Sequence, residues 1–336
     1  MPIDPIALAR QLIDIPSTTD NEALHAEFLE GQFSRMGFTT RRQQVTPTRF
    51  NIYASASADY PRIVMNSHLD TVPPWFGSYE DEEFIYGRGA CDTKGIIAAM
   101  LAAGERLHSD GRRKFAFLFV VGEETDSIGA KSANEAFRDL GSEYVLVGEP
   151  TESKFARASK GAFTCFVRFD GVAAHSAYPE RGDSAINKMV AAIAEINRTP
   201  WGWHDVLGEA TVNVGVVRGG EKPNIIAAQA ECEMIFRTVS DPAEVRVKLL
   251  PLLERFGGTI TVERGNPPQF MTVPPDMQST IVAFNTDVPH LGNLGKPLLF
   301  GPGSILDAHG AKEKIGKKEL LRAVQTYYDT VVALCQ

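Results

Sequence analysis

The sequence has 336 residues, which is enough for two domains or for one domain that carries a large insertion. Its 43% hydrophobic and 23% charged residues are typical of a globular protein and exclude a disordered chain, and no apolar run is long enough to span a bilayer. The net charge of -8 argues against sequence-independent binding to the phosphates of nucleic acids. We expect neither a nucleic-acid nor a membrane partner.

The amino-terminal segment predicts a structural helix rather than a signal peptide. Asp4 is a candidate N-cap, and Pro5 suits the first helical position. The segment lacks a basic region followed by an apolar stretch, which a signal peptide would need. The four cysteines of the chain are scattered and form no CxxC pair, which favours reduced thiols and a cytoplasmic location.

Apolar strands alternate with helices along the first 150 residues. We predict strands at 62–66, 115–121 and 144–147, with helices at 93–107 and 130–138. Continuous apolar strands separated by helices indicate an α/β domain with a mainly parallel sheet that is covered on both faces. In such a sheet, ligands bind at the carboxyl ends of the strands.

The pattern changes at about Gly161, where shorter strands with alternating apolar residues begin. Strands and helices then follow in the order βαββαβ, which suggests a small sheet with two helices on one face. The predicted strands are 162–169, 210–217, 229–237 and 259–263, and the predicted helices are 184–197 and 242–256. We therefore predict a discontinuous catalytic domain, 1–160 and 266–336, with an inserted α+β lid or dimerisation domain at 161–265. Strand 297–300 and helix 317–334 complete the catalytic domain.

Metal-binding types of residue follow the predicted strands. His68 comes directly after the first of them, with Asp70 two residues on, where a carboxylate could fix the tautomer of a metal-binding imidazole. Asp92 follows a glycine-rich turn at the start of an apolar helix. Taken alone, the first pair fits a surface turn and Asp92 fits an N-cap. In the functional alternative, Asp92 is a carboxylate that bridges two cations and offsets their repulsion.

Three further acids and a second histidine occupy similar positions. Glu123 and Glu124 follow the next strand; consecutive side chains point in different directions, so one can bind metal while the other faces an attacking water. Glu149 and His309 follow two more strands of the same predicted sheet. Each residue alone fits an ordinary loop, but chance does not readily put such residues at four strand ends. Imidazole and carboxylate ligands suit Zn²⁺ best, with Co²⁺ or Mn²⁺ as substitutes.

These motifs, in this order, resemble the acetylornithine deacetylase and succinyl-diaminopimelate desuccinylase family of di-zinc amidohydrolases. That family also includes carboxypeptidases, dipeptidases and aminoacylases, and the likeness covers nearly the whole chain. The resemblance implies two Zn²⁺ per chain. It implies that His68 and Glu149 bind one zinc, that Glu124 and His309 bind the other, and that Asp92 bridges them.

The resemblance also implies roles for residues beyond the metal ligands. Glu123 is similar to the general base of the family, and Asp70 to the carboxylate behind the histidine ligand. His175 is similar to a histidine that reaches the active site of a neighbouring subunit, which implies a homodimer formed through the lid. Asn224 and Arg237 resemble residues that hold a substrate carboxylate, for which the guanidinium fork is suited.

The favoured function is cleavage of the amide bond of an N-acyl amino acid, with N-acetylornithine as the leading substrate. A carboxypeptidase or dipeptidase with the same metal centre is the alternative, and a catalytically silent binding protein on this fold is a remote one. Lys160 and Thr286 are further candidates for substrate contact, although ordinary surface roles fit them equally well. A nucleotide site is disfavoured, because the glycine-rich turn lacks a third glycine and no GxxxxGK[ST] occurs.

Overall fold

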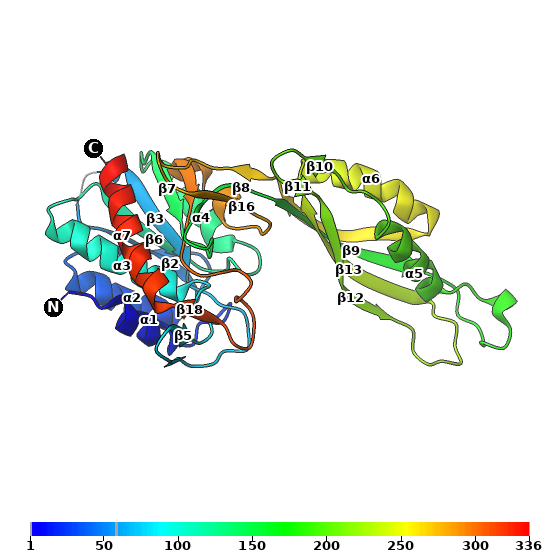
Figure 1. Cartoon of the computed structure of the whole chain (residues 1–336). Coiled ribbons are helices and arrows are strands. Elements are labelled where there is room, and N and C mark those ends of the chain that lie inside the picture. The colour runs from blue at the N-terminus through cyan, green and yellow to red at the C-terminus, as the bar shows by residue number, and fades with distance from the viewer. Residues whose placement is uncertain (1, 58–59, 336) are drawn as a thin grey trace. The chain divides into compact units, whose positions relative to one another are not determined.

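The computed structural model describes residues 2–57 and 60–335, which divide into two compact units (Figure 1). The first unit comprises Met1–Arg157, Met271–Thr280 and Thr286–Gln336, and the second comprises Ala158–Phe270 and Ile281–Asn285. The second unit is longer than the predicted insertion at 161–265. Strand pairing explains the extension at its two ends, because Ala158 and Ser159 pair with Phe270 and Gln269.

The first unit is built on a six-stranded mixed sheet with strand order β1-β2-β6-β3-β7-β17. Strands β6, β3, β7 and β17 are parallel, whereas β1 and β2 form an antiparallel edge. The predicted α/β class and mainly parallel sheet are confirmed. The strands are β1 (Thr39–Gln44), β2 (Phe50–Ser55), β3 (Ile63–His68), β6 (Phe115–Val120), β7 (Tyr144–Val147) and β17 (Lys296–Leu299).

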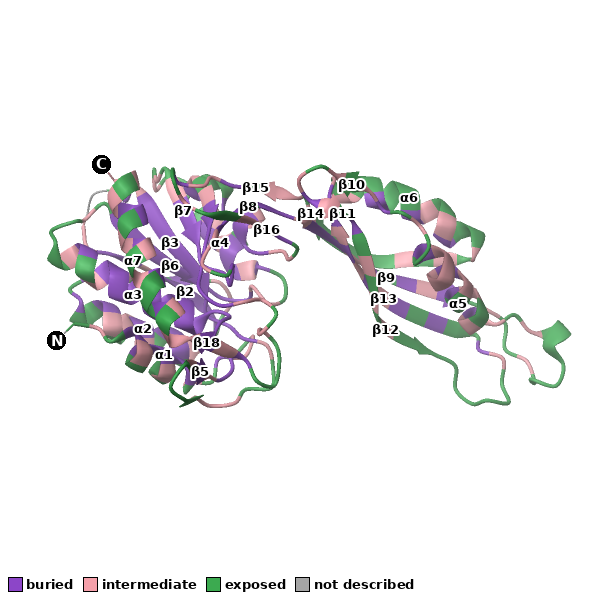
Figure 2. Ribbon diagram, viewed as in Figure 1, coloured by how far each residue is buried: buried purple, intermediate pink, exposed green. Residues whose placement is uncertain are grey.

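Burial separates the predicted strands β3 and β6 from the exposed strand β1, although β2, which is also mostly buried, was not predicted either. Every residue of β3 and β6 is buried, and Figure 2 shows these strands at the centre of the unit. Strand β1 escaped prediction because it is polar (TTRRQQ) and mostly exposed at the sheet edge. Two smaller sheets have the orders β18-β5-β4 and β15-β8-β16. Their strands are β4 (Tyr79–Glu80), β5 (Phe84–Tyr86), β8 (Phe155–Ser159), β15 (Gln269–Phe270), β16 (Ser279–Val282) and β18 (Lys314–Gly316).

The helices of the first unit pack on this sheet and on one another. Helix α3 (Lys94–Ser109) is the most buried of them; it contacts β3, α1 and α7. The predicted first helix is confirmed as α1 (Pro5–Ile13), whose N-cap Asp4 accepts hydrogen bonds from two backbone N–H groups. The others are α2 (Ala23–Arg35), α4 (Ile128–Ala136) and α7 (Lys317–Leu334), with short 3₁₀ turns η2 (Val288–His290) and η3 (Gly292–Leu294).

The second unit has an antiparallel four-stranded sheet in the order β12-β13-β9-β14. Helices α5 and α6 both contact this sheet and each other, so they share one face, where alternate residues of β13 are buried. The predicted order βαββαβ is confirmed, with one extra hairpin before β12. The elements are β9 (Gly161–Asp170), η1 (Pro179–Arg181), α5 (Ala185–Ile196), β10 (Trp203–His204), β11 (Gly208–Glu209), β12 (Thr211–Gly219), β13 (Gln229–Thr238), α6 (Pro242–Arg255) and β14 (Gly258–Asn266).

The described residues also bear on the expectations about membranes and thiols. Between residues 2 and 335, leaving out 58–59, no helix is both long and apolar enough to cross a membrane. All four cysteines are free thiols, three of them buried. A cytoplasmic location stays a prediction.

Candidate metal centre

The structure brings together all five predicted metal ligands at one edge of the large sheet. His68 is the last residue of β3, and Glu149 lies two residues beyond the end of β7. Glu123 and Glu124 follow β6. These strands are parallel neighbours, so their carboxyl ends meet at one edge.

One carboxylate stands between the two histidines. The Nε2 atom of His68 lies 2.9 Å from Oδ1 of Asp92, and Nε2 of His309 lies 3.3 Å from Oδ2 of the same residue. Beyond this shared carboxylate, His68 Nε2 is 3.9 Å from Oε1 of Glu149, and His309 Nε2 is 3.1 Å from Oε2 of Glu124. The arrangement therefore contains two groups of donors that share Asp92.

Glu123 lies inside this cluster as well. One oxygen of its carboxylate, one of Glu149 and a ring nitrogen of His68 lie within 4.8 Å of one another. Burial, and then the charge of Glu149, raises the pKa of Glu123 well above its ordinary value. Burial, and then the charge of Asp92, does the same to the pKa of Glu149. Negative charge is thus costly at this position unless a cation accompanies it.

The histidines are held in an environment rich in carboxylates. Hydrogen bonds with Asp92 and then Glu124 raise the pKa of His309 to about 10. Burial opposes protonation of His68, but its hydrogen bond with Asp92 and the surrounding carboxylates raise its pKa well above the ordinary value. Four acids facing two imidazoles are a donor set that two divalent cations would neutralise, and nitrogen and oxygen donors of this kind fit Zn²⁺.

The ring of His68 is oriented by the backbone that follows it. Its Nδ1 atom lies 2.8 Å from the carbonyl oxygen of Asp70. A carbonyl oxygen only accepts hydrogen bonds, so Nδ1 carries a proton and Nε2 is left to face Asp92. The Asp70 carboxylate also lies near this ring, with Oδ1 3.7 Å from Nδ1, which is ion-pair distance but too long for a hydrogen bond.

The Asp70 carboxylate instead organises the turn after β6. Its Oδ1 accepts the backbone N–H groups of Gly122 and Glu123 at 3.0 and 3.1 Å, and its Oδ2 accepts that of Glu124 at 3.3 Å. The reason lies in the path of the chain: the N–H of Leu69 donates to the carbonyl of Val120, which keeps this segment against the end of β6. Asp70 therefore orients the imidazole through its backbone carbonyl and positions Glu123 and Glu124 through its carboxylate.

Asp287 is a residue of this region that the sequence analysis missed. It is 1% exposed, burial raises its pKa to about 6, and its charge raises the pKa values of Glu123 and Glu149. No predicted strand precedes it, so nothing in the sequence marked its position. The neighbouring Thr286, singled out as a substrate contact, is buried and accepts the N–H of Val288 at 3.2 Å, a local structural role.

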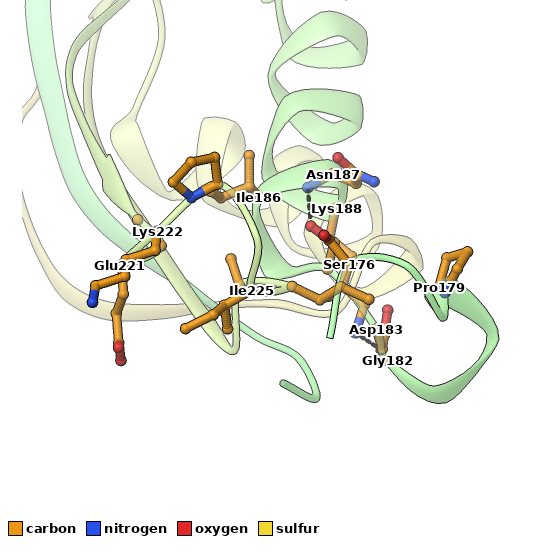
Figure 3. Close-up of a pocket in the computed structure, with 16 residues that line it drawn as sticks. Ser176, Pro179, Gly182, Asp183, Ile186, Asn187, Lys188, Glu221, Lys222 and Ile225 are labelled. Atoms are coloured by element: carbon orange, nitrogen blue, oxygen red, sulfur yellow. Dashed lines mark hydrogen bonds and ion pairs between the residues drawn. The ribbon is translucent and has the colours of Figure 1, made fainter. Parts of the chain in front are cut away.

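The other predicted substrate residues belong to the second unit. Lys160 donates to the carbonyl oxygen of Glu209. His175 is exposed and forms a β-bridge with Ile225. The N–H of Ser176 donates to the carbonyl oxygen of Asn224 at 3.1 Å. The loop that contains His175 and the loop that contains Asn224 border a pocket of about 770 Å³. Figure 3 shows Ser176 and Ile225 among the residues that line it.

Arg237 lies at the opposite end of the same sheet. Asn224 precedes β13, which begins at Gln229, whereas Arg237 is the last but one residue of that strand. At about 3.3 Å per residue, a strand of this length separates its ends by roughly 25 Å. A single chain therefore does not bring Asn224 and Arg237 together on one small carboxylate.

Comparison with known proteins agrees with this architecture. A peptidase M20 domain-containing protein of Schizosaccharomyces pombe is 36% identical over 332 residues, covering 96% of this chain and 82% of the relative. A probable carboxypeptidase of Aspergillus flavus is 32% identical over 378 residues, covering 98% of this chain and 90% of the relative. Among solved structures, a tripeptidase from Staphylococcus aureus has a similar fold, with a TM-score of 0.81 and 21% identity. The match covers 99% of this chain and 98% of the tripeptidase chain.

The sequence model of Peptidase family M20/M25/M40 matches residues 64–333, a span that contains the five clustered ligands. It also contains the whole of the second unit. The expectation of a hydrolase that acts on amide bonds is confirmed at the level of this family. The chain belongs to peptidase family M20/M25/M40.

Proposed function

We propose that the chain is a di-zinc hydrolase that cleaves the amide bond beside a free carboxylate in a small substrate. The observation that carries this proposal is the position of Asp92, whose two oxygens face His68 and His309 separately. His68 and Glu149 would hold one ion, Glu124 and His309 the other, and Asp92 both. When bound, the pair of ions supplies Lewis acidity and a nucleophile at neutral pH.

Glu123 is the proposed general base. It accepts a proton from the attacking water and passes it to the leaving amine. Its backbone N–H donates a hydrogen bond to Asp70 at 3.1 Å. This contact fixes the backbone from which the Glu123 carboxylate extends toward His68 and Glu149. Asp70 is thus a positioning residue for this base.

Two substrate classes contain an amide bond beside a carboxylate. One comprises N-acyl amino acids, with N-acetylornithine as the leading member, for which the motifs that resemble acetylornithine deacetylases argue. The other comprises dipeptides and longer peptides cut at the carboxyl end, and the name of the 32% identical Aspergillus relative favours this class. In both, the Arg237 guanidinium offers a planar, bidentate partner for the carboxylate.

A substrate panel distinguishes these classes and tests the carboxylate requirement. Zinc-reconstituted protein is given N-acetylornithine, other N-acetyl amino acids and unblocked and N-blocked dipeptides, each beside its carboxamide, and amine release is measured. We expect kcat/KM to fall about 10- to 100-fold for each carboxamide, since a hydrogen bond to a charged group contributes about 1.5–3 kcal/mol. Equal values for acid and amide would contradict the carboxylate clamp, and cleavage of dipeptides alone would exclude deacetylation.

We also propose a homodimer, formed through the lid, in which His175 of one chain completes the active site of the other. The exposed position of His175, on a loop of the second unit, supports this proposal. Twofold dimers are the commonest oligomers and make such sharing reciprocal.

Subunit exchange tests the shared site. His175→Ala and Glu123→Gln proteins should each be nearly inactive, because each dimer lacks one of the two groups in every site. A mixed dimer has one site with both groups intact, so we expect activity to reappear on mixing, approaching a quarter of wild type at statistical exchange. Each variant incubated alone is the control. Demonstrated exchange without recovered activity would show that His175 does not serve the partner's site.

A further inference from the structure

A buried ion pair lies directly behind the proposed metal centre. Arg88 and Glu313 are 2% and 0% exposed, and Nη1 of Arg88 lies 2.6 Å from Oε2 of Glu313. Neither residue belongs to the ligand set. Burying two charges is costly even when they are paired, so their contacts with the surrounding backbone indicate what the pair does.

Glu313 holds the backbone of the bridging residue. Its Oε1 atom accepts the N–H of Asp92 at 3.2 Å and that of Cys91 at 3.3 Å. The backbone carbonyl of Glu313 also accepts the N–H of Gly87 at 3.0 Å, so both ends of the turn that leads to Asp92 are tied to one residue. This residue is more than 220 positions away along the chain and immediately precedes the small strand β18.

Arg88 holds the backbone of the second histidine. Its Nη2 atom donates to the carbonyl oxygen of His309 at 3.4 Å, and its Nε atom donates to that of Pro74 at 3.2 Å. His309 stands in an irregular segment after β17, at a left-handed φ of 62°, and its side chain is 50% exposed. A non-glycine residue in this conformation needs support from its surroundings, and the Arg88 contact supplies part of it.

We propose that the Arg88–Glu313 pair positions Asp92 and His309 relative to each other and thereby sets the affinity for the ion that these two residues share with Glu124. The inference rests on the proposed metal centre. It assigns control of the metal affinity to residues that are not themselves ligands. One guanidinium reaches three different acceptors in a fixed plane here. Lysine would keep the charge but could not hold the same three groups together.

The experiment measures zinc affinity rather than turnover. Metal-free Arg88→Lys protein is titrated with zinc against a chromogenic chelator, and the two dissociation constants are compared with those of the wild type. Loss of a partner behind a metal ligand typically costs about 10- to 100-fold in metal affinity. We expect one constant to rise by this factor and the other to stay within about threefold. His309→Ala identifies which constant belongs to the affected ion, because that constant should be lost.

Two more variants make the result specific. Arg10→Lys is the matched control: Arg10 forms an ion pair with Glu80, also at 2.6 Å, but on the surface, so both constants should be unchanged. Glu313→Gln keeps the volume of the side chain while removing the charge beside Asp92. Because Asp92 serves both ions, we expect both constants to rise, by about tenfold or more.

The outcomes separate this inference from the proposed function. Failure of the wild type to bind two ions would refute the metal centre, and the inference with it. Two ions in the wild type with unchanged constants in Arg88→Lys would refute only the positioning role. If Arg88→Lys does not fold, the test rests on Glu313→Gln. Two zinc dissociation constants that are unchanged in Glu313→Gln would then contradict the inference. Saturating zinc should restore two equivalents to Arg88→Lys, whereas a purely structural role would lower its melting temperature and leave the ratio of the two constants as in the wild type.

Discussion

Replacing Glu123 with glutamine is expected to reduce kcat by about 10²- to 10⁴-fold, the usual contribution of a general base. The amide has nearly the same shape as the carboxylate but cannot accept the proton of the attacking water. The backbone contact of residue 123 with Asp70 is made by its N–H group, so the turn should keep its conformation. The five ligands are unchanged, and we therefore expect both zinc ions to remain.

Turnover is to be measured on samples whose zinc content has been determined, so that loss of metal is not mistaken for loss of the base. Glu82→Gln is the matched control, since Glu82 is an exposed acid on a turn and should behave as wild type. A near-normal rate in fully metallated Glu123→Gln protein would place the base elsewhere, with Asp287 as the next buried carboxylate to test.

Replacing Asp92 with alanine is expected to remove both metal ions, and activity with them. Asp92 is the carboxylate that approaches both histidines, at 2.9 Å and 3.3 Å. Without it, each ion would keep one imidazole and one carboxylate from the predicted set, and nothing would offset the repulsion between two cations only about 3.5–4 Å apart. Glu124→Ala, by contrast, should weaken mainly the ion at His309.

Metal analysis after reconstitution and removal of loosely bound zinc measures this directly, with about two equivalents expected for the wild type. Asp139→Ala, which removes an exposed aspartate from the same unit, should retain both. Circular dichroism establishes that the fold survives. Two full equivalents in folded Asp92→Ala protein would contradict the bridging role, and loss of a single ion would assign Asp92 to one site only.

Three of the proposed ligands, His68, Glu124 and Glu149, were predictable from the sequence because they stand at or just after strand ends, which are local features. Strand β6 (FAFLFV) is a run of apolar residues and β3 begins with one (IVM), so a histidine or acid soon after such a run stands out against it. In a parallel sheet these ends lie along one edge, so positions far apart in the chain converge without knowledge of the loops. Strand β1 lacked this signal because its outward position at the sheet edge permits polar residues.

The amino-acid sequence by itself therefore determined the fold class, the order of the main buried strands and of most helices, and most of the residues gathered at the sheet edge. The tertiary structure alone decided how those residues are held. Asp70 contacts the turn after β6 through hydrogen bonds that no local pattern encodes. Arg88 meets Glu313 because separate loops fold against each other, and a single buried charge in a loop looks like a surface residue until its partner is known.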